Sequence, residues 1–296
     1  MEESIKATCK QNKYGFYEII NKPTEKELAR FYAEKYYQGE KSIYRSTYPK
    51  DEIRYFEIRD DLKLRIINKL VKFSNAKLLD IGCGEGFTLS YFSKNNWKVK
   101  GLDFSSFGCE SMNVDQLKNL VAGNIYDSLN EIEEKDEKFD VIIMNNLLEH
   151  VLDPVKIVIQ INALLNDNGV LVVQVPNDFS YFQQFLKEKK HIKNDFWITY
   201  PDHMNYFTRK SLKTFLEEFG WKESYVLAEF PIDLFLANEH SNYINKPETG
   251  KAAHQARIEL MGFFYDTDPE KAIEMFNKMA ELGFGRQIVG FFQKKS

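Results

Sequence analysis

The segment AKLLDIGCGEGFTL, at residues 76–89, constrains the fold of this chain more than any other stretch. An apolar run ending at Ile81 is followed by Gly82, Gly84 and Gly86, and an amphipathic stretch begins at Phe87. Glycine permits a tight strand-to-helix turn and lets a ligand come close to the backbone. The segment therefore predicts a strand, a nucleotide-binding loop and a helix, in that order.

From residue 76 onward, apolar runs alternate with segments of helical periodicity. Runs with the composition of buried strands stand at 77–81, 98–104, 118–123, 138–146, 169–176, 222–230 and 286–293. Buried strands separated by helices indicate a sheet covered on both faces. We expect a helical cap over 1–75 and one catalytic domain over 76–296, with a lid at about 178–207 and a helical insert at about 236–284.

Short polar signals mark where several helices begin and end. Thr24 followed by Glu27 has the spacing of a capping box. Asp153 suits an N-cap, and Pro154 suits the first turn of the helix that follows. That helix is expected to end at Gly169.

Composition excludes several functional classes. Net charge is -4 and the isoelectric point is about 5.9, so nothing indicates general affinity for nucleic acid or anionic membrane. The polar N-terminus lacks a signal core, and no run approaches the roughly 18 apolar residues of a spanning helix. Cys9, Cys83 and Cys109 are too widely spaced for a paired-cysteine metal site. We expect a cytoplasmic protein, monomeric or homodimeric, without metal or membrane insertion.

The glycine spacing bears on which nucleotide is bound. A dinucleotide fingerprint needs G-x-G-x-x-G, and Phe87 stands where its third glycine would be. Asp103 ends the next strand, 17 residues after Gly86 (103 minus 86), where a carboxylate can accept both ribose hydroxyls of an adenosine. These features disfavour a nicotinamide oxidoreductase and leave other adenosine ligands open.

A longer set of motifs adds a family resemblance. FDVIIMNNLLEHVLDP, taken with LLDIGCGEGF, GLDFS and LLNDNGVLVVQVPN, resembles the class I S-adenosylmethionine-dependent methyltransferases over residues 76–177. DHMNYFTRKSLKTFLEEFGW and KPTEKELARFYAEKYYQ resemble bacterial methyltransferases of sugars and surface polysaccharides. The resemblance implies an α/β, doubly wound, Rossmann-like sheet of seven strands in the order 3-2-1-4-5-7-6, with the last strand antiparallel.

The resemblance also implies S-adenosyl-L-methionine as the cofactor, bound at the carboxyl ends of the first and fourth strands. Asp80 would lie near the methionine amino group, Asp103 would hold the ribose, and Phe104 would cover the adenine. Some relatives hold zinc on paired N-terminal cysteines, but only Cys9 stands here, so no metal is carried over. The implied cofactor-binding set is Asp80, Gly82, Cys83, Gly84, Gly86, Asp103, Phe104, Asn124, Ile125 and Asn145.

A sugar hydroxyl is a poor nucleophile until a general base accepts its proton. His203, in PDHMNYF, is the expected base, because similar sugar methyltransferases place a histidine there. His240, with Glu239 beside it to orient the imidazole, and His150 remain alternatives. The expected substrate contacts are Tyr37, Tyr206, Asn238 and Tyr243.

The sequence thus predicts methyl transfer to a hydroxyl of a nucleotide-linked or phosphorylated sugar in surface-polysaccharide biosynthesis. Methylation of an amine, a carbon or a phosphorus-containing group on the same fold stays open. So does a catalytically silent S-adenosylmethionine-binding protein, although the intact glycines and Asp103 argue against it.

Overall fold

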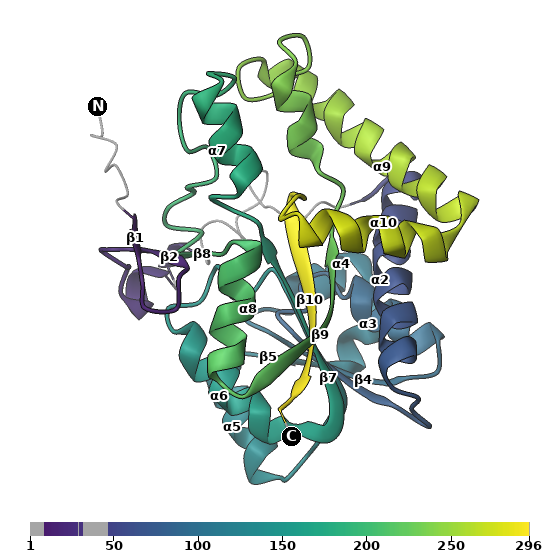
Figure 1. Ribbon diagram of the computed structural model, residues 1–296. Coiled ribbons are helices and arrows are strands. Elements are labelled where there is room, and N and C mark those ends of the chain that lie inside the picture. The colour runs from purple at the N-terminus through teal and green to yellow at the C-terminus, as the bar shows by residue number, and fades with distance from the viewer. Residues whose placement is uncertain (1–8, 29, 32–46, 296) are drawn as a thin grey trace.

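A twisted sheet runs through the molecule and carries helices on both faces (Figure 1). The structure is a computed structural model that describes residues 9–28, 30–31 and 47–295. The strand order is β5 (Leu120–Ala122), β4 (Lys98–Asp103), β3 (Lys77–Ile81), β6 (Phe139–Asn145), β7 (Leu165–Pro176), β10 (Gln287–Lys294) and β9 (Trp221–Ala228). β10 is antiparallel to both of its neighbours, and the pairs from β5 to β7 are parallel. This confirms the predicted order and the antiparallel last strand.

The period-two pattern of the strands decides which helices cover which face. Leu78 packs with Phe92 in one apolar cluster, whereas Leu79 and Ile81 belong to the other. The first face is covered by α2 (Lys50–Leu70), α3 (Phe87–Lys94), α9 (Gly250–Thr267) and α10 (Pro269–Glu281). The second is covered by α5 (Ile125–Glu134), α6 (Pro154–Leu164) and α8 (Arg209–Glu218).

The helix signals in the sequence hold with one correction. Thr24 and Glu27 form the expected capping box, with Glu27 N–H donating to Thr24 Oγ1 at 3.2 Å, and Asp153 caps α6. However, α6 ends at Leu164 and not at Gly169, because β7 starts directly at Leu165. Gly169 lies in a tight bend of that strand, where an added Cβ would stand 2.6 Å from Leu165 Cγ.

The N-terminal segment also differs from the helical cap expected over residues 1–75. β1 (Cys9–Gln11) and β2 (Tyr17–Ile19) form a hairpin, and β2 pairs with β8 (Asn205–Tyr206) in a second, three-stranded sheet. Strands of two or three residues carry no readable periodicity, and β8, which pairs with β2, lies almost two hundred positions further along the chain. Among the residues of this segment that the structure describes, α2 and the stretch just after Thr24 have the predicted helical character.

The remaining elements lie along the strand ends. α4 (Phe107–Met112) and η2 (Val114–Asn119) join β4 to β5, and α7 (Tyr181–Glu188) lies inside the segment expected to be a lid. The helical insert is made of η3 (Ile232–Ala237), η4 (Pro247–Thr249), α9 and α10. Among the described residues, no helix has the length and apolar character needed to cross a membrane.

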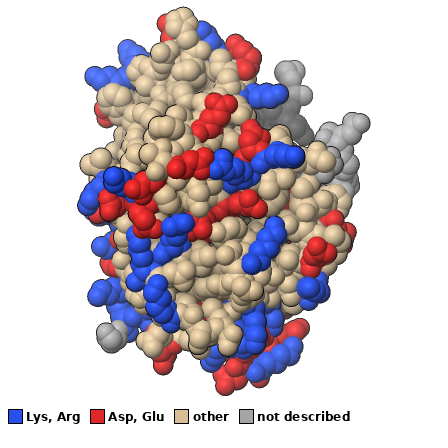
Figure 2. Space-filling view, turned by 90° about the vertical axis from the view of Figure 1, so that its right-hand side faces the viewer, with Lys and Arg blue, Asp and Glu red and all other residues tan. Residues whose placement is uncertain are grey.

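The face formed by α2, α9 and α10 carries interleaved charges of both signs (Figure 2). Arg54 pairs with Asp266, and Arg65 bridges Asp61 and Glu270. Each of these exposed ion pairs contributes little stability. Because charges of both signs are interleaved, the described part of this face has no extended patch of one charge sign.

Candidate functional site

The glycine loop between β3 and α3 has the conformation that its sequence requires. Gly82, Gly84 and Gly86 have φ values of 77°, 53° and 73°, all in the left-handed region that side chains disfavour. A Cβ at Gly82 would also stand 3.1 Å from Leu147 Cδ1. Side chains at these positions would therefore strain the turn, and at Gly82 one would also crowd Leu147.

Asp103, at the end of β4, is tied to that loop by backbone hydrogen bonds. Its Oδ2 accepts from Gly84 N–H at 2.8 Å, and its Oδ1 accepts from Ser105 N–H at 3.1 Å. Burial raises the pKa of Asp103, and these backbone donors oppose the rise. Because each carboxylate oxygen accepts more than one hydrogen bond, Asp103 can still bind two ribose hydroxyls.

The predicted adenine contacts lie on the rim next to Asp103. Phe104 is 49% exposed, so its ring is available to cover a flat ligand. Asn124 and Ile125 stand where α5 begins, and the Asn124 side chain accepts a hydrogen bond from Tyr126 N–H at 2.9 Å. The side-chain oxygen of Asn124 therefore caps the N-terminus of α5.

A cavity of about 200 Å³ opens beside the glycine loop. It is lined by Phe56, Arg59, Asp60, Lys63, Asp80, Gly82, Cys83, Glu85, Phe87, Thr88, Asn145 and Asn146. The sequence analysis did not predict the three charged residues that α2 contributes, Arg59, Asp60 and Lys63. Charged residues on the buried face of a helix are a signal that could have indicated them. Lys63 and Asp60 form a buried ion pair at 3.1 Å, and Arg59 pairs with Glu229.

Two polar atoms in this cavity have no partner among the described residues. They are Asp80 Oδ1 and Asn145 Oδ1, in side chains that lie at the ends of β3 and β6. Burial, together with the charge of Asp60, raises the pKa of Asp80 to about 8. Buried polar atoms are almost always hydrogen-bonded, so these two fit a ligand that donates hydrogen bonds, such as an ammonium group.

Cys83 packs inside the glycine loop. Its side chain is buried, and burial raises the pKa of its thiol well above the ordinary value. A thiol that stays protonated is a poor nucleophile, which supports packing as its role.

A second cluster lies just past the end of β6. Glu149, His150 and His203 bring one side-chain oxygen or nitrogen each to within 4.8 Å of one another. The rings of His150 and His203 meet edge to face, with centroids 4.7 Å apart. The structure therefore unites two of the three histidines predicted as bases.

A buried asparagine joins the two chain segments that carry this cluster. Asn205 Nδ2 donates to the carbonyl oxygens of Leu148 at 2.9 Å and Val151 at 2.7 Å. Met204 N–H donates to the carbonyl oxygen of Glu149 at 2.7 Å. These bonds hold His203 beside His150 across about fifty residues of sequence.

Asp202 orients His150. His150 Nδ1 lies 2.9 Å from the Asp202 carbonyl oxygen and 3.4 Å from its carboxylate. Because a carbonyl oxygen only accepts, Nδ1 carries the proton and Nε2 is the basic nitrogen. Burial lowers the pKa of His150, but Asp202 and Glu149 outweigh it and raise the pKa.

Glu149 is the buried acid of the cluster. Its side chain is 1% exposed, and burial raises its pKa to about 7 against the opposing charge of His150. Two imidazoles and a carboxylate at this separation could also hold a divalent cation. Sequence spacing gave no sign of this, because Glu149 and His203 are far apart in the chain.

The other predicted site residues have different places. Glu239 and His240 are exposed in the loop after η3, as is Asn238, and they are not members of the histidine cluster. Tyr206 is fully buried and donates to the His203 carbonyl oxygen at 2.8 Å, so it supports His203 and has no open face toward a substrate. Tyr37 lies outside the described residues.

A network at the start of β10 was also missed by sequence reasoning. Arg286 pairs with Asp178 at 2.7 Å, and Arg286 Nε lies 3.9 Å from Asp233. Tyr243 donates to Asp233 at 2.7 Å, so this predicted substrate residue is part of the network. Asp178 follows β7 and Arg286 precedes β10, which places the network at the same edge of the sheet as the glycine loop.

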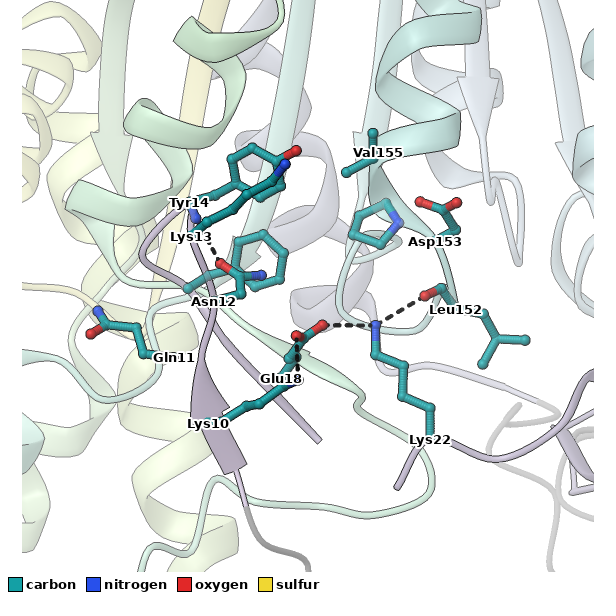
Figure 3. Close-up of a pocket in the computed structure, with 12 residues that line it drawn as sticks. Lys10, Gln11, Asn12, Lys13, Tyr14, Glu18, Lys22, Leu152, Asp153 and Val155 are labelled. Atoms are coloured by element: carbon teal, nitrogen blue, oxygen red, sulfur yellow. Dashed lines mark hydrogen bonds and ion pairs between the residues drawn. The ribbon is translucent and has the colours of Figure 1, made fainter. Parts of the chain in front are cut away.

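A separate groove of about 400 Å³ lies between the β1–β2 hairpin and the start of α6 (Figure 3). Lys22 crosses it, donating to the Leu152 carbonyl oxygen at 3.0 Å and pairing with Glu18 at 3.3 Å. Neither the glycine loop nor the histidine cluster lines this groove. We therefore place the candidate site at the glycine loop and the histidine cluster.

Comparisons with known proteins identify the family to which this chain is similar. The family model described as "Methyltransferase domain" matches residues 55–224. A ubiquinone biosynthesis O-methyltransferase from Pelagibacter ubique is 32% identical over 127 residues, which is 42% of this chain and 52% of that protein. Another from Histophilus somni is 36% identical over 110 residues, or 34% and 45% of the two chains. The chain thus spans about half the length of the curated relatives it matches.

A solved structure covers much more of the chain. The SAM-dependent methyltransferase from Archaeoglobus fulgidus superposes with a TM-score of 0.51 at 19% identity, covering 90% of this chain and 99% of that one. At this identity the likeness concerns the fold.

Proposed function

The chain belongs to the methyltransferase-domain family, and we propose that it transfers a methyl group from S-adenosylmethionine to a hydroxyl of a small acceptor. The observation that carries this proposal is the meeting of two sites at the end of β6. Asn145 lines the glycine-loop cavity, and the Glu149–His150 pair follows four residues later. This closeness along the chain supports a donor site beside a proton acceptor, as a methyl transfer to oxygen requires.

The cavity residues fit the cofactor. Asp103 would hold the ribose. Asp80 and Asn145 would accept hydrogen bonds from the methionine ammonium group through their Oδ1 atoms, which have no partner among the described residues. Lys63 or Arg59 of α2 would face the carboxylate, since both line the cavity. When bound there, S-adenosylmethionine supplies a methyl group attached to a positively charged sulfur.

The histidine cluster would manage the acceptor proton. His203 would accept the proton that the acceptor hydroxyl loses when its oxygen is methylated. His150, held by Asp202, is the alternative base, with Nε2 as its basic nitrogen. The His203 ring also meets the buried Tyr206 ring, with centroids 6.2 Å apart, so His203 is held between His150 and Tyr206.

Within this reaction we propose a sugar hydroxyl as the acceptor, on the resemblance of the DHMNYF segment to sugar methyltransferases. A phenolic hydroxyl is the second candidate, because the curated relatives are named for O-methylation in ubiquinone biosynthesis. Amine, carbon and phosphorus acceptors would need no base or a different one.

The test is an acceptor panel with the full chain. Nucleotide sugars, sugar phosphates, catechols and small amines are each incubated with S-adenosylmethionine, and methylated products are identified by mass spectrometry. Transfer to sugar hydroxyls supports the proposed acceptor, and transfer to catechols assigns the second candidate. Exclusive N-methylation, or cofactor binding without turnover of any class, would contradict the proposal.

A further inference from the structure

The rim of the sheet edge that carries the candidate site exposes large apolar side chains. Tyr181 is 81% exposed, Leu282 is 76% exposed and Phe185 is 43% exposed. Tyr181 and Phe185 are four residues apart on α7 and therefore lie on one face of that helix. Exposed aromatic and aliphatic side chains that gather in one place are uncommon on a free surface.

Contacts between α7 and the end of α10 make these side chains one surface. A Cβ built on Gly283 would lie 3.7 Å from Tyr181 Cδ2, which places Leu282 beside the start of α7. The rings of Phe182 and Phe284 meet edge to face, with centroids 4.9 Å apart. We call Tyr181, Phe185 and Leu282 the apolar rim; α7 stands at the upper end of the molecule in Figure 1.

Lysines border the apolar rim. Lys189 Nζ lies 5.9 Å from the Phe185 ring centroid, and Lys190 and Lys193 are exposed in the segment that follows α7. Lys187 is paired with Asp195 at 2.6 Å, whereas no ion pair within the described part of the chain engages Lys189, Lys190 or Lys193. Three positive charges thus remain available next to the exposed rings.

We propose that the apolar rim and these three lysines form a docking surface for an anionic phospholipid bilayer. Tyr181 and Phe185 on one face of α7, with Leu282 at the end of α10, would bury in the boundary between headgroups and acyl chains. Lysines beside them are attracted to the negative surface of anionic lipids. A second copy of this chain fits less well, because a symmetric contact would bring the same lysines together across the two-fold axis.

The surface also has a defined relation to the candidate site. Asp178 precedes Tyr181 by three residues, and Arg286 follows Leu282 by four, and these two side chains form the ion pair described above. A bilayer docked on the rim would therefore face the sheet edge that carries the candidate site. This docking does not depend on the proposed methyl transfer, and its test requires no turnover.

The experiment measures co-sedimentation of the full chain with vesicles. Phosphatidylcholine vesicles are compared with vesicles in which about a third of the lipid is phosphatidylglycerol. We expect binding to the anionic vesicles that weakens as salt is added, since each lysine near the surface strengthens binding by about fivefold. Lys189→Gln, Lys190→Gln and Lys193→Gln together should weaken it by on the order of 100-fold.

The control for charge is the triple variant Lys72→Gln, Lys118→Gln and Lys222→Gln, which removes the same charge from other exposed positions. Tyr181→Ser with Leu282→Ser should also weaken binding on the order of 100-fold. Its control is Phe263→Ser with Ile159→Ser, at side chains that are 62% and 56% exposed elsewhere.

Three results would overturn the proposal. The first is that the chain does not sediment with anionic vesicles. The second is that the rim variants and their controls lose vesicle binding to the same extent. The third is a dimer in size-exclusion chromatography that Tyr181→Ser with Leu282→Ser dissociates, which would assign the rim to a second copy.

Discussion

The glycine loop and the histidine cluster lie at the same edge of the sheet, yet the chain builds them in different ways. The loop uses residues 80–86 and the end of the neighbouring strand at Asp103, so its geometry follows from one turn and one strand pair. The cluster needs Glu149 and His150 from one segment and His203 from another, joined through the buried side chain of Asn205. The sequence pointed to His203 and His150 as separate candidates, but it could not show that tertiary hydrogen bonds bring them together.

The largest expected effect concerns the histidine cluster. His203→Ala should lower turnover by about 10²–10⁴-fold, the usual contribution of general base catalysis, with unchanged affinity for S-adenosylhomocysteine. Steady-state kinetics at saturating acceptor measures the turnover, and calorimetry measures the affinity for S-adenosylhomocysteine. His240→Ala is the matched control, because His240 is exposed and outside the cluster. A larger loss in His240→Ala would show that the cluster is not the proton acceptor.

A buried acid of the glycine-loop cavity should show a large effect of pH on stability. The pKa of Asp80 is raised from 3.8 to about 8, so the folded state favours its protonated form. That contribution to stability is fully present below about pH 4 and is lost as the pH rises through about 8. Asp80→Asn cannot ionise and should therefore gain a few kcal/mol relative to the unliganded parent between these limits.

Urea unfolding at a series of pH values measures this gain, and calorimetry should show weaker cofactor binding in the same variant. Asp140→Asn, at a partly exposed position on the opposite end of β6, is the control. A stability difference that does not change with pH would mean that Asp80 is ionised at neutral pH in the folded protein.

Substitutions of Asp103 test whether the glycine loop and Asp103 bind the cofactor. Asp103→Ala should weaken S-adenosylhomocysteine binding by about 1.5–3 kcal/mol, the range for hydrogen bonds to a charged group. Because Asp103 also accepts from Gly84 and Ser105, Asp103→Asn is needed beside it to keep part of the loop contacts. Tighter binding of NAD than of S-adenosylhomocysteine by the parent chain would contradict the assignment of the loop.

The smallest expected effect is that of chelation. Turnover should survive prolonged treatment with EDTA, since the spacing of cysteines and histidines in the sequence indicates no metal site. This prediction is challenged most directly by the cluster of Glu149, His150 and His203, because its geometry could hold a cation. Loss of activity on chelation, with recovery on adding zinc or magnesium, would replace the metal-free mechanism with a metal-assisted one.

Much of the fold was predictable because its signals are local. The seven strands and their order follow from apolar runs and from the family resemblance, and the caps at Thr24 and Asp153 follow from side chains next to the backbone groups they bind. The end of α6 was not predictable in this way. Asn168 and Gly169 have the composition of a helix stop, but pairing with β6 draws Leu165 into the sheet first.

The sequence by itself indicated the glycine loop, since a tight turn with positive φ at Gly82, Gly84 and Gly86 is favoured where no side chain is present. It also determined which strands are buried, because apolar periodicity records burial directly. Only the tertiary structure decided between His203 and His240 as members of a cluster, and only it placed Arg59 and Lys63 in the cofactor cavity. It also decided that lysines in a chain of net charge -4 border an exposed apolar rim. The physical reason is that packing and hydrogen bonds such as those of Asn205 join distant residues, and a charge total or a spacing along the chain contains no information on such distances.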